Sequence, residues 1–298
     1  MSGIQGFEVA RVDVGEVHLS VHRAGEGTPL ILLHGYPQNH MTWAPVAPAF
    51  AQYFDVIVPD LRGYGASDAP EDDADHTVYS KRRMAQDIVG LMQALGLEEA
   101  HIIGHDRGAR VAYRFALDHP RHVLRLGICD VVPTSDWWAA WNAEIALAAY
   151  HWTFLAQPAP LPERMILADP EAYLDWTIAQ WTASGDLSPF SAAALASYRA
   201  QMATPARCAA MCADYRAGAT TDRQIDLESR RQNARIRVPL HFRYGAHGFP
   251  AQTEDPAGLW AAWADTVTTS MSQSGHFSME EDPDGFVSTF VPFLMGHA

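Results

Sequence analysis

The sequence predicts an α/β protein with a mostly parallel, doubly wound sheet and a helical insertion. Apolar runs alternate with helical patterns over the first 130 residues and again after residue 236, which is typical of strands and helices in a parallel sheet. Between residues 133 and 235 this alternation stops, and the segment is rich in Trp, Ala and Tyr. We expect a core made of residues 1–132 and 236–298, with residues 133–235 inserted as a helical cap over the carboxyl ends of the strands.

Local hydrophobic patterns predict the individual elements. Alternation at residues 7–14 and 16–22 indicates a starting hairpin. Short apolar runs predict buried parallel strands at residues 29–33, 54–59, 100–103, 123–129, 238–244 and 267–271. Helical periodicity predicts core helices at residues 80–95, at residues 109–117 and from about residue 283 onward.

Composition excludes several classes of protein. A net charge of −14 argues against a nucleic-acid partner and against an acidic membrane surface. No run approaches about 18 continuous apolar residues, and no basic leader precedes an apolar stretch, so we expect a soluble cytoplasmic protein. Cys129, Cys208 and Cys212 show neither disulfide-framework nor zinc-ligand spacing, which predicts buried free thiols and no metal site.

Residues 104–108 (Gly-His-Asp-Arg-Gly) lie between a predicted strand and a predicted helix. This is the elbow pattern that exposes its middle residue at the top of a parallel sheet. The usual occupant is Ser, whereas this chain has Asp106. Because a carboxylate is already ionised at neutral pH, it can displace a leaving group at a saturated carbon and form an ester. We predict that Asp106 is a nucleophile; the alternative is an Asp that only caps the following helix.

Two further strand ends supply partners for such a nucleophile. Asp130 follows the strand after the elbow, and His276 lies in residues 274–277 (Ser-Gly-His-Phe) after the last strand. The expected roles are activation of water by His276 and orientation of its ring by Asp130. Asp130 as a simple turn residue is the alternative. The other place for an acid, after Tyr244, offers no carboxylate before Glu254.

Arg107 and Arg110 follow the predicted nucleophile, three residues apart on one helix face. Guanidinium groups match a carboxylate in a bidentate way, so this pair suggests an anionic substrate; the alternative is a solvated helix face. Arg114, one turn further, is expected to be paired inside the protein. The backbone N–H groups of Tyr36 and Arg107 are expected to form an oxyanion hole.

Three motifs carry a resemblance to a known superfamily. Residues 34–37 (His-Gly-Tyr-Pro), residues 60–65 (Asp-Leu-Arg-Gly-Tyr-Gly) and residues 274–277 resemble those of the α/β-hydrolase superfamily. In this superfamily the chain order is nucleophile, acid, histidine. Asp106 at the elbow narrows the resemblance to the haloalkane dehalogenase, haloacetate dehalogenase and epoxide hydrolase branches.

The residue after the nucleophile separates these branches. Residues 104–111 resemble the haloacetate (fluoroacetate) dehalogenases, because epoxide hydrolases and haloalkane dehalogenases generally carry Trp where this chain has Arg107. Residues 150–162 and 212–218 in the expected cap are also similar to this family, so the resemblance covers nearly the whole chain.

The resemblance implies roles for further residues. Arg107 and Arg110 would bind the substrate carboxylate. His151, Trp152 and Tyr215 would donate hydrogen bonds to the departing halide. Their alternative is an aromatic cluster that only packs the cap. Trp181 also matches a position near the pocket of this family. The list of implied pocket residues is therefore Arg107, Arg110, His151, Trp152, Trp181 and Tyr215.

The implied activity is hydrolysis of a haloacetate to glycolate and halide, with no metal and no organic cofactor, by an enzyme that is a homodimer. An epoxide hydrolase on the same scaffold is one alternative; Tyr150 and Tyr215 would then act on the epoxide oxygen, but His151 and Arg107 fit that chemistry poorly. The other alternative is a non-catalytic binding protein. That interpretation would require the loss of a triad residue, but all three triad residues are present. Which halide can leave stays open, since pocket size and placement decide it.

Overall fold

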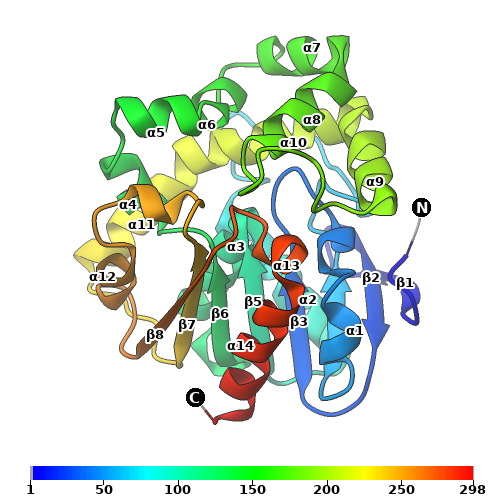
Figure 1. Ribbon diagram of the computed structural model, residues 1–298, viewed down its shortest axis with the longest axis vertical. Coiled ribbons are helices and arrows are strands. Elements are labelled where there is room, and N and C mark those ends of the chain that lie inside the picture. The colour runs from blue at the N-terminus through cyan, green and yellow to red at the C-terminus, as the bar shows by residue number, and fades with distance from the viewer. Residues whose placement is uncertain (1–2, 298) are drawn as a thin grey trace.

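A computed structural model describes residues 3–297 and shows one eight-stranded sheet in the order β1-β2-β4-β3-β5-β6-β7-β8 (Figure 1). β1 (Glu8–Asp13) and β2 (His18–Ala24) form the expected antiparallel hairpin, and β2 pairs antiparallel with β4. The remaining strands pair in parallel, as predicted. They are β3 (Pro29–Leu33), β4 (Asp55–Pro59), β5 (Ala100–His105), β6 (Val123–Cys129), β7 (Leu240–Gly245) and β8 (Val267–Ser272).

The central strands are buried because helices cover both faces of the sheet. Every residue of β4 and β5 is buried. In Figure 1, α1 and α14 lie in front of the sheet and α2 and α3 lie behind it. The helices outside residues 133–235 are α1 (Ala47–Phe50), α2 (Lys81–Ala94), α3 (Asp106–Asp118), α12 (Pro256–Ala261), α13 (Ser278–Glu281) and α14 (Pro283–Met295), with short turns η1 (His40–Trp43), η2 (Pro120–His122) and η3 (Pro250–Gln252).

Several boundaries differ by one to three residues from the sequence prediction, and two of these differences have a clear physical reason. Helix α3 begins at Asp106 itself, three residues before the predicted start, because the helix follows the elbow without a linker. Strand β7 begins at Leu240, after Pro239, since proline has no N–H to donate to a neighbouring strand.

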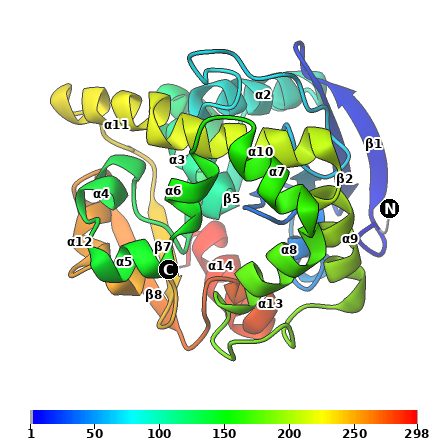
Figure 2. The same ribbon diagram turned by 90° about the horizontal axis from the view of Figure 1, so that it is seen from above.

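Residues 133–235, called the helical segment below, connect β6 to β7. The segment contains eight helices, and within the described residues it has no strand. Figures 1 and 2 show that it lies over the edge of the sheet where β3, β5 and β6 end. Its helices are α4 (Thr134–Ala139), α5 (Ala143–Ala148), α6 (His151–Leu155), α7 (Leu161–Ala168), α8 (Pro170–Ala179), α9 (Ala192–Met202), α10 (Pro205–Ala219) and α11 (Thr221–Arg231). Its division from the core as a separate domain stays a prediction.

The three cysteines are buried and free, as predicted; they are Cys129, Cys208 and Cys212. Over residues 3–297, no helix has the length and apolar character needed to span a membrane. The same residues contain no cluster of three or more His, Cys, Asp or Glu side chains that could hold a metal ion.

Candidate active site

Asp106 occupies a tight turn between β5 and α3, in the left-handed region at φ 45°. Such a φ is uncommon for a residue other than glycine and needs support from its surroundings. The flanking glycines explain how the turn packs. A Cβ at Gly104 would lie 2.5 Å from the carbonyl oxygen of Gly108, and a Cβ at Gly108 would lie 2.3 Å from the carbonyl oxygens of Leu33 and His34. The elbow therefore presents Asp106 only because both positions lack a side chain.

The Asp106 carboxylate is nearly enclosed and still ionised. Its Oδ2 accepts a hydrogen bond from the Tyr36 backbone N–H at 2.9 Å. Burial alone would raise the pKa of Asp106, but the neighbouring His276, Arg107 and Arg110 outweigh burial and hold that pKa below its ordinary value. One carboxylate oxygen is thus engaged by Tyr36, which is one of the two predicted oxyanion-hole donors.

His276 and Asp130 form a buried pair beside the elbow. The Nδ1 atom of His276 lies 2.6 Å from Oδ2 of Asp130. Asp130 also accepts hydrogen bonds from the backbone N–H groups of Gly245 at 2.9 Å and Phe249 at 3.3 Å. Burial raises the pKa of Asp130, although these hydrogen bonds oppose the rise. The carboxylate accepts from Nδ1–H, so the other ring nitrogen of His276, Nε2, is left to accept a proton.

The loop that carries His276 is attached to the helical segment. The His276 backbone N–H donates to the carbonyl oxygen of Trp181 at 2.7 Å. Glu281 reinforces this contact, because its Oε2 accepts from the backbone N–H of Gly275 at 2.9 Å and from that of Ala183 at 2.8 Å. The backbone on either side of His276 is therefore fixed by residues of both layers.

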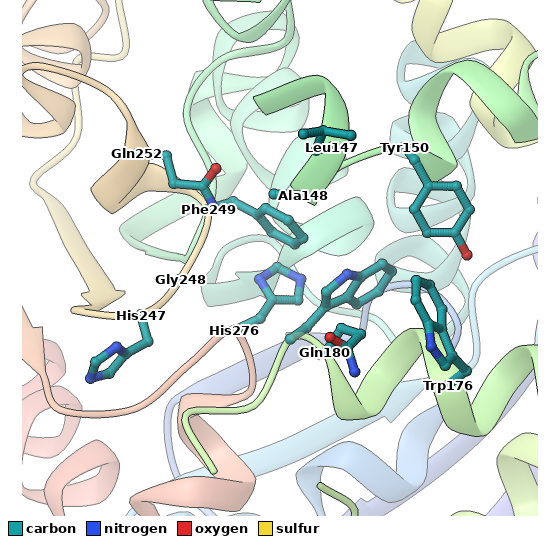
Figure 3. Close-up of a pocket in the computed structure, with 11 residues that line it drawn as sticks. Leu147, Ala148, Tyr150, Trp176, Gln180, His247, Gly248, Phe249, Gln252 and His276 are labelled. Carbon is teal, nitrogen blue, oxygen red and sulfur yellow. The ribbon is translucent and has the colours of Figure 1, made fainter. Parts of the chain in front are cut away.

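A small, narrow cavity is lined by the three residues of the predicted triad. Its lining residues are Asp106, Arg110, Asp130, Val131, Val132, Trp137, Trp152, Phe249, Pro250 and His276. A second, larger outer pocket shares Phe249 and His276 with it (Figure 3). The outer pocket reaches the surface, since its lining includes Leu147 (83% exposed) and Trp176 (57% exposed). Figure 3 shows the His276 ring directly below the Phe249 ring, and their centroids are 4.9 Å apart.

Arg107 is completely buried and held by a carboxylate from the helical segment. Its Nε donates to Oδ2 of Asp214 at 3.2 Å, and its Nη2 donates to Oδ1 of Asp214 at 2.7 Å. The guanidinium lies over the ring of Tyr215, 4.3 Å from the centroid, and 5.1 Å from the ring of Trp152. Its Nη1 has no hydrogen-bond partner among the described side chains and backbone.

Arg110 is buried but has no acidic partner in residues 3–297. Its Nη1 donates to the carbonyl oxygen of Val132 and to Oγ1 of Thr134, both at 3.0 Å, and its Nε has no partner there. The guanidinium lies 4.6 Å from the centroid of Trp152. Burial lowers the pKa of Arg110, though an arginine remains charged. The cavity wall therefore carries a positive charge that has no direct ion pair in the described residues, although the Asp106 carboxylate in the same cavity interacts with it at longer range.

The three residues predicted to hold a halide do lie together. His151 and Trp152 open helix α6, and Tyr215 comes from α10. The Tyr215 ring centroid is 5.4 Å from that of His151 and 5.5 Å from that of Trp152. The Oη of Tyr215 and the Nδ1 of His151 are buried without a hydrogen-bond partner in the described part of the chain. Trp181 packs on His151 with ring centroids 4.3 Å apart and lines the outer pocket.

Both orphaned groups are neutral. Burial lowers the pKa of His151 well below its ordinary value, and burial raises the pKa of the Tyr215 phenol well above its ordinary value. A neutral imidazole donates from one ring nitrogen, and a protonated phenol donates from its oxygen. The arrangement can therefore stabilise a small anion by hydrogen bonds without transferring a proton to it.

Several residues at or around the site were not predicted from sequence. Asp214 directly precedes Tyr215 in the motif at residues 212–218, and that adjacency was the available signal. Phe249 and Trp137 line the cavity, but nothing in their sequence context marks them. Arg114 pairs with Asp226 at 2.8 Å, so the prediction of an internally paired arginine is confirmed.

Glu280 is another buried carboxyl that the sequence did not indicate. It follows His276 on α13 and joins three elements. Its Oε2 accepts from Gln38, two residues after Tyr36, and from Oγ1 of Thr42 at 3.1 Å. Its Oε1 accepts from Oη of Tyr198 on α9 at 3.0 Å. Burial raises the pKa of Glu280 to about 8.

Comparison with known proteins places the chain in a family but not with one substrate. The family model described as the alpha/beta hydrolase fold matches residues 28–283. The fluoroacetate dehalogenase of Burkholderia sp is 39% identical over 290 residues, covering 97% of this chain and 94% of that protein. The soluble epoxide hydrolase of Corynebacterium sp. (strain C12) is 31% identical over 276 residues, covering 91% of each chain.

Solved structures agree with the fold. ALR0039 from Nostoc sp PCC 7120 superposes with a TM-score of 0.94 at 42% identity, covering 98% of this chain and 99% of that chain. A mutant of a Pseudomonas aeruginosa protein provisionally described as an epoxide hydrolase, solved with bound MFA, has a TM-score of 0.92 at 41% identity and covers 100% and 98% of the two chains. With the family model spanning most of its length and the sheet as described, this chain belongs to the α/β hydrolase family.

Proposed function

We propose that this protein hydrolyses a haloacetate to glycolate and halide, with Asp106 as nucleophile. The observation that carries the proposal is Arg110, a buried cation without an acidic partner in the described chain, in the same cavity as Asp106. Burying an unpaired charge is costly, so a site that retains one is suited to a substrate that brings the opposite charge. A small carboxylate meets that requirement, and the fluoroacetate dehalogenase relative supports it.

The first step forms an ester between enzyme and substrate. Because the Tyr36 N–H holds Oδ2 of Asp106, Oδ1 is the oxygen left to attack the α-carbon. The Oδ1–carbon bond forms while the carbon–halogen bond breaks, and the halide leaves with the bonding electron pair. Hydrogen bonds from His151, Trp152 and Tyr215 would stabilise charge that appears only as the halide departs.

The second step returns the free carboxylate. His276 takes a proton from water at Nε2, and the resulting hydroxide attacks the ester carbonyl carbon of Asp106. The negative charge that develops on Oδ2 is held by the Tyr36 N–H and by the backbone N–H of Arg107. Glycolate leaves when the tetrahedral intermediate collapses, and its alkoxide oxygen takes the proton from His276. The Asp106 carboxyl group, which now holds the oxygen and the second proton of the water, releases that proton to solvent and becomes a carboxylate again. Asp130 stabilises the imidazolium between these transfers.

An epoxide hydrolase is the second candidate, because Tyr215 presents a free hydroxyl and several relatives carry that name. The site offers less support for it. Such chemistry would use Tyr150 as its second tyrosine. The hydroxyl of Tyr150 lies 3.1 Å from Oγ1 of Thr177, and Tyr150 lines the outer pocket. Arg110 would in addition stay unpaired beside a neutral epoxide.

The direct test is to incubate the protein separately with chloroacetate, fluoroacetate and styrene oxide, and to measure halide release and diol formation. Halide release from chloroacetate that disappears in Asp106→Asn supports the proposal. Diol formation without halide release would select the epoxide hydrolase. If neither product forms at high enzyme concentration, both candidates are rejected. A homodimer stays a prediction, which sedimentation of the purified protein would test.

A further inference from the structure

A buried group of charged residues contacts Arg107. Asp214 on α10 is its centre and is 0% exposed. Its Oδ2 accepts from Oη of Tyr64 at 2.7 Å, and its Oδ1 also accepts from the ammonium group of Lys81, the first residue of α2. Lys81 reaches Oδ2 of Asp222 at 3.4 Å. No solvent screens these charges, so their arrangement controls how Arg107 is held.

Asp214 and its surroundings leave Arg107 one orientation. The carboxylate engages Nε and Nη2 of the guanidinium, and the carbonyl oxygen of Asp214 accepts a further bond from Nη2 at 2.8 Å. On another side, Gly218 leaves just enough room: a Cβ there would lie 2.9 Å from Nη2. The rings of Tyr215 and Trp152 cover a face of the guanidinium. Only Nη1 remains without a partner among the described residues.

The charges of the two arginines are compensated differently. Burial would raise the pKa of Asp214, but Arg107 and Lys81 outweigh burial and lower it, so Asp214 is ionised. Arg107 and Lys81 then face Asp214 and Asp222, which gives two cations and two carboxylates. Arg110 donates to no carboxylate in residues 3–297, and the Asp106 carboxylate interacts with it only at longer range.

We propose that Asp214 is a positioning residue that aims Nη1 of Arg107 at the substrate carboxylate, whereas Arg110, which makes no direct ion pair with a carboxylate of the described residues, supplies the positive charge that attracts it. This inference rests on the proposed haloacetate activity. It divides two tasks that the sequence assigned jointly to the arginine pair: Arg107 contributes direction, and Arg110 contributes charge. Asp214 touches no substrate and acts only through Arg107.

A purely electrostatic role for Asp214 predicts the opposite behaviour. If Asp214 served only as a counter-charge, its replacement by Asn would leave Arg107 more positive and would strengthen the binding of a carboxylate. If Asp214 positions Arg107, the same replacement disrupts the two hydrogen bonds between the Asp214 carboxylate and the Arg107 guanidinium, and the binding of a carboxylate becomes weaker. The direction of the change therefore separates the two roles.

The test compares Asp214→Asn with Tyr64→Phe and with the control Asp87→Asn. Asp87 holds Arg62 by a similar buried pair of hydrogen bonds, with Nε at 2.6 Å from Oδ2, but the other hydrogen bonds of Arg62 go to Val78 and Glu16, which are not residues of the proposed site. The readouts are KM and kcat for chloroacetate, the affinity for acetate measured by tryptophan fluorescence, and the melting temperature. Acetate is an unreactive carboxylate, so its binding reports the arginine pair without chemistry.

For Asp214→Asn we expect KM for chloroacetate and the dissociation constant of acetate to rise about tenfold to hundredfold, the effect of misplacing a binding group by about 1 Å. Tyr64→Phe keeps the hydrogen bonds between Asp214 and Arg107 but removes the one that Tyr64 donates to Asp214. Both constants should therefore rise, but by less than in Asp214→Asn. Asp87→Asn lowers the melting temperature and leaves both constants near those of the parent. If Asp214→Asn does not fold, Tyr64→Phe decides the direction.

Two outcomes overturn the inference: tighter acetate binding in either variant, or unchanged constants in a folded Asp214→Asn protein. Failure of the proposed function looks different. The parent protein would then release no chloride from chloroacetate, while acetate binding and its dependence on Asp214 would still report whether Arg107 is positioned as inferred.

Discussion

Replacing Gly35 by Ala should displace the proposed nucleophile without removing any functional group. Gly35 lies in the loop after β3, directly before Tyr36. A Cβ at this position would lie 2.5 Å from Cβ of Asp106, 2.9 Å from its Oδ2 and 3.1 Å from the carbonyl oxygen of His105. The first two contacts press on the side chain that has to attack the substrate.

The magnitude follows from the contact distances. Ordinary van der Waals contact begins at 3.4 Å, so the Asp106 side chain has to retreat by about 0.9 Å. The elbow backbone cannot follow, because Gly104 and Gly108 are already packed against neighbouring backbone. A misplacement of about 1 Å at a reacting group costs roughly 100-fold in rate. We therefore expect kcat/KM for chloroacetate to fall about 100-fold, or about 2.7 kcal/mol of barrier.

The assay is steady-state chloride release, combined with the rate of ester formation in a His276→Asn background, where mass spectrometry follows the modified protein. Gly90→Ala is the matched control, because its Cβ would lie 2.3 Å from the carbonyl oxygen of Val14, on α2 and outside both pockets. That variant should lose stability but keep its rate. A folded Gly35→Ala protein that forms the ester at the parent rate would refute the reasoning.

Three further predictions concern single side chains. His276→Asn should accumulate an Asp106 ester, seen as one added carboxymethyl group by intact mass after exposure to chloroacetate; an unchanged mass would reject the assigned roles. Tyr215→Phe should lower turnover about 100-fold to 1000-fold, as expected for loss of a donor to a developing anion. The loss should be larger for fluoroacetate than for bromoacetate, because fluoride accepts stronger hydrogen bonds. Equal losses for the two substrates would contradict a contact between Tyr215 and the halide. Folding raises the pKa of Glu280 from 4.5 to about 8, so between these pH values the folded protein retains a proton that the unfolded chain releases. The free energy of unfolding should therefore fall as the pH rises from about 4.5 to about 8. Glu280→Gln should remove this slope, at most about 1.4 kcal/mol per pH unit, in urea titrations at several pH values; an unchanged slope would place the titration elsewhere.

Features that depend on neighbouring residues in the chain were predictable. The elbow around Asp106 is a local backbone requirement, because its glycines and its strand–helix context follow from sequence alone. Asp130 and His276 could be paired with it because the carboxyl ends of parallel strands meet at one edge of a sheet. His151, Trp152 and Tyr215 were found only through resemblance, since their separation in sequence gives no physical reason for them to meet.

Features that depend on how the helical segment packs on the sheet were not predictable. Arg107 and Arg110 look equivalent in sequence, being on one face of one helix. Their difference arises because α10 brings Asp214 to Arg107 and nothing comparable to Arg110. Glu280 escaped notice for the same reason, because its three partners come from separate elements and only the packed structure shows that its carboxyl is buried.

The attachment of the helical segment to the His276 loop limits how substrate can enter. The hydrogen bond from His276 to Trp181 and the bridge through Glu281 join the segment to the residue proposed to activate water. Swinging the whole segment outward would therefore disassemble the site on every turnover. We expect this layer to stay closed and substrate to pass by rotation of rings such as Trp181 and Phe249 between the outer pocket and the cavity. Exchange would then be governed by side-chain rotation, which is faster than the movement of a domain.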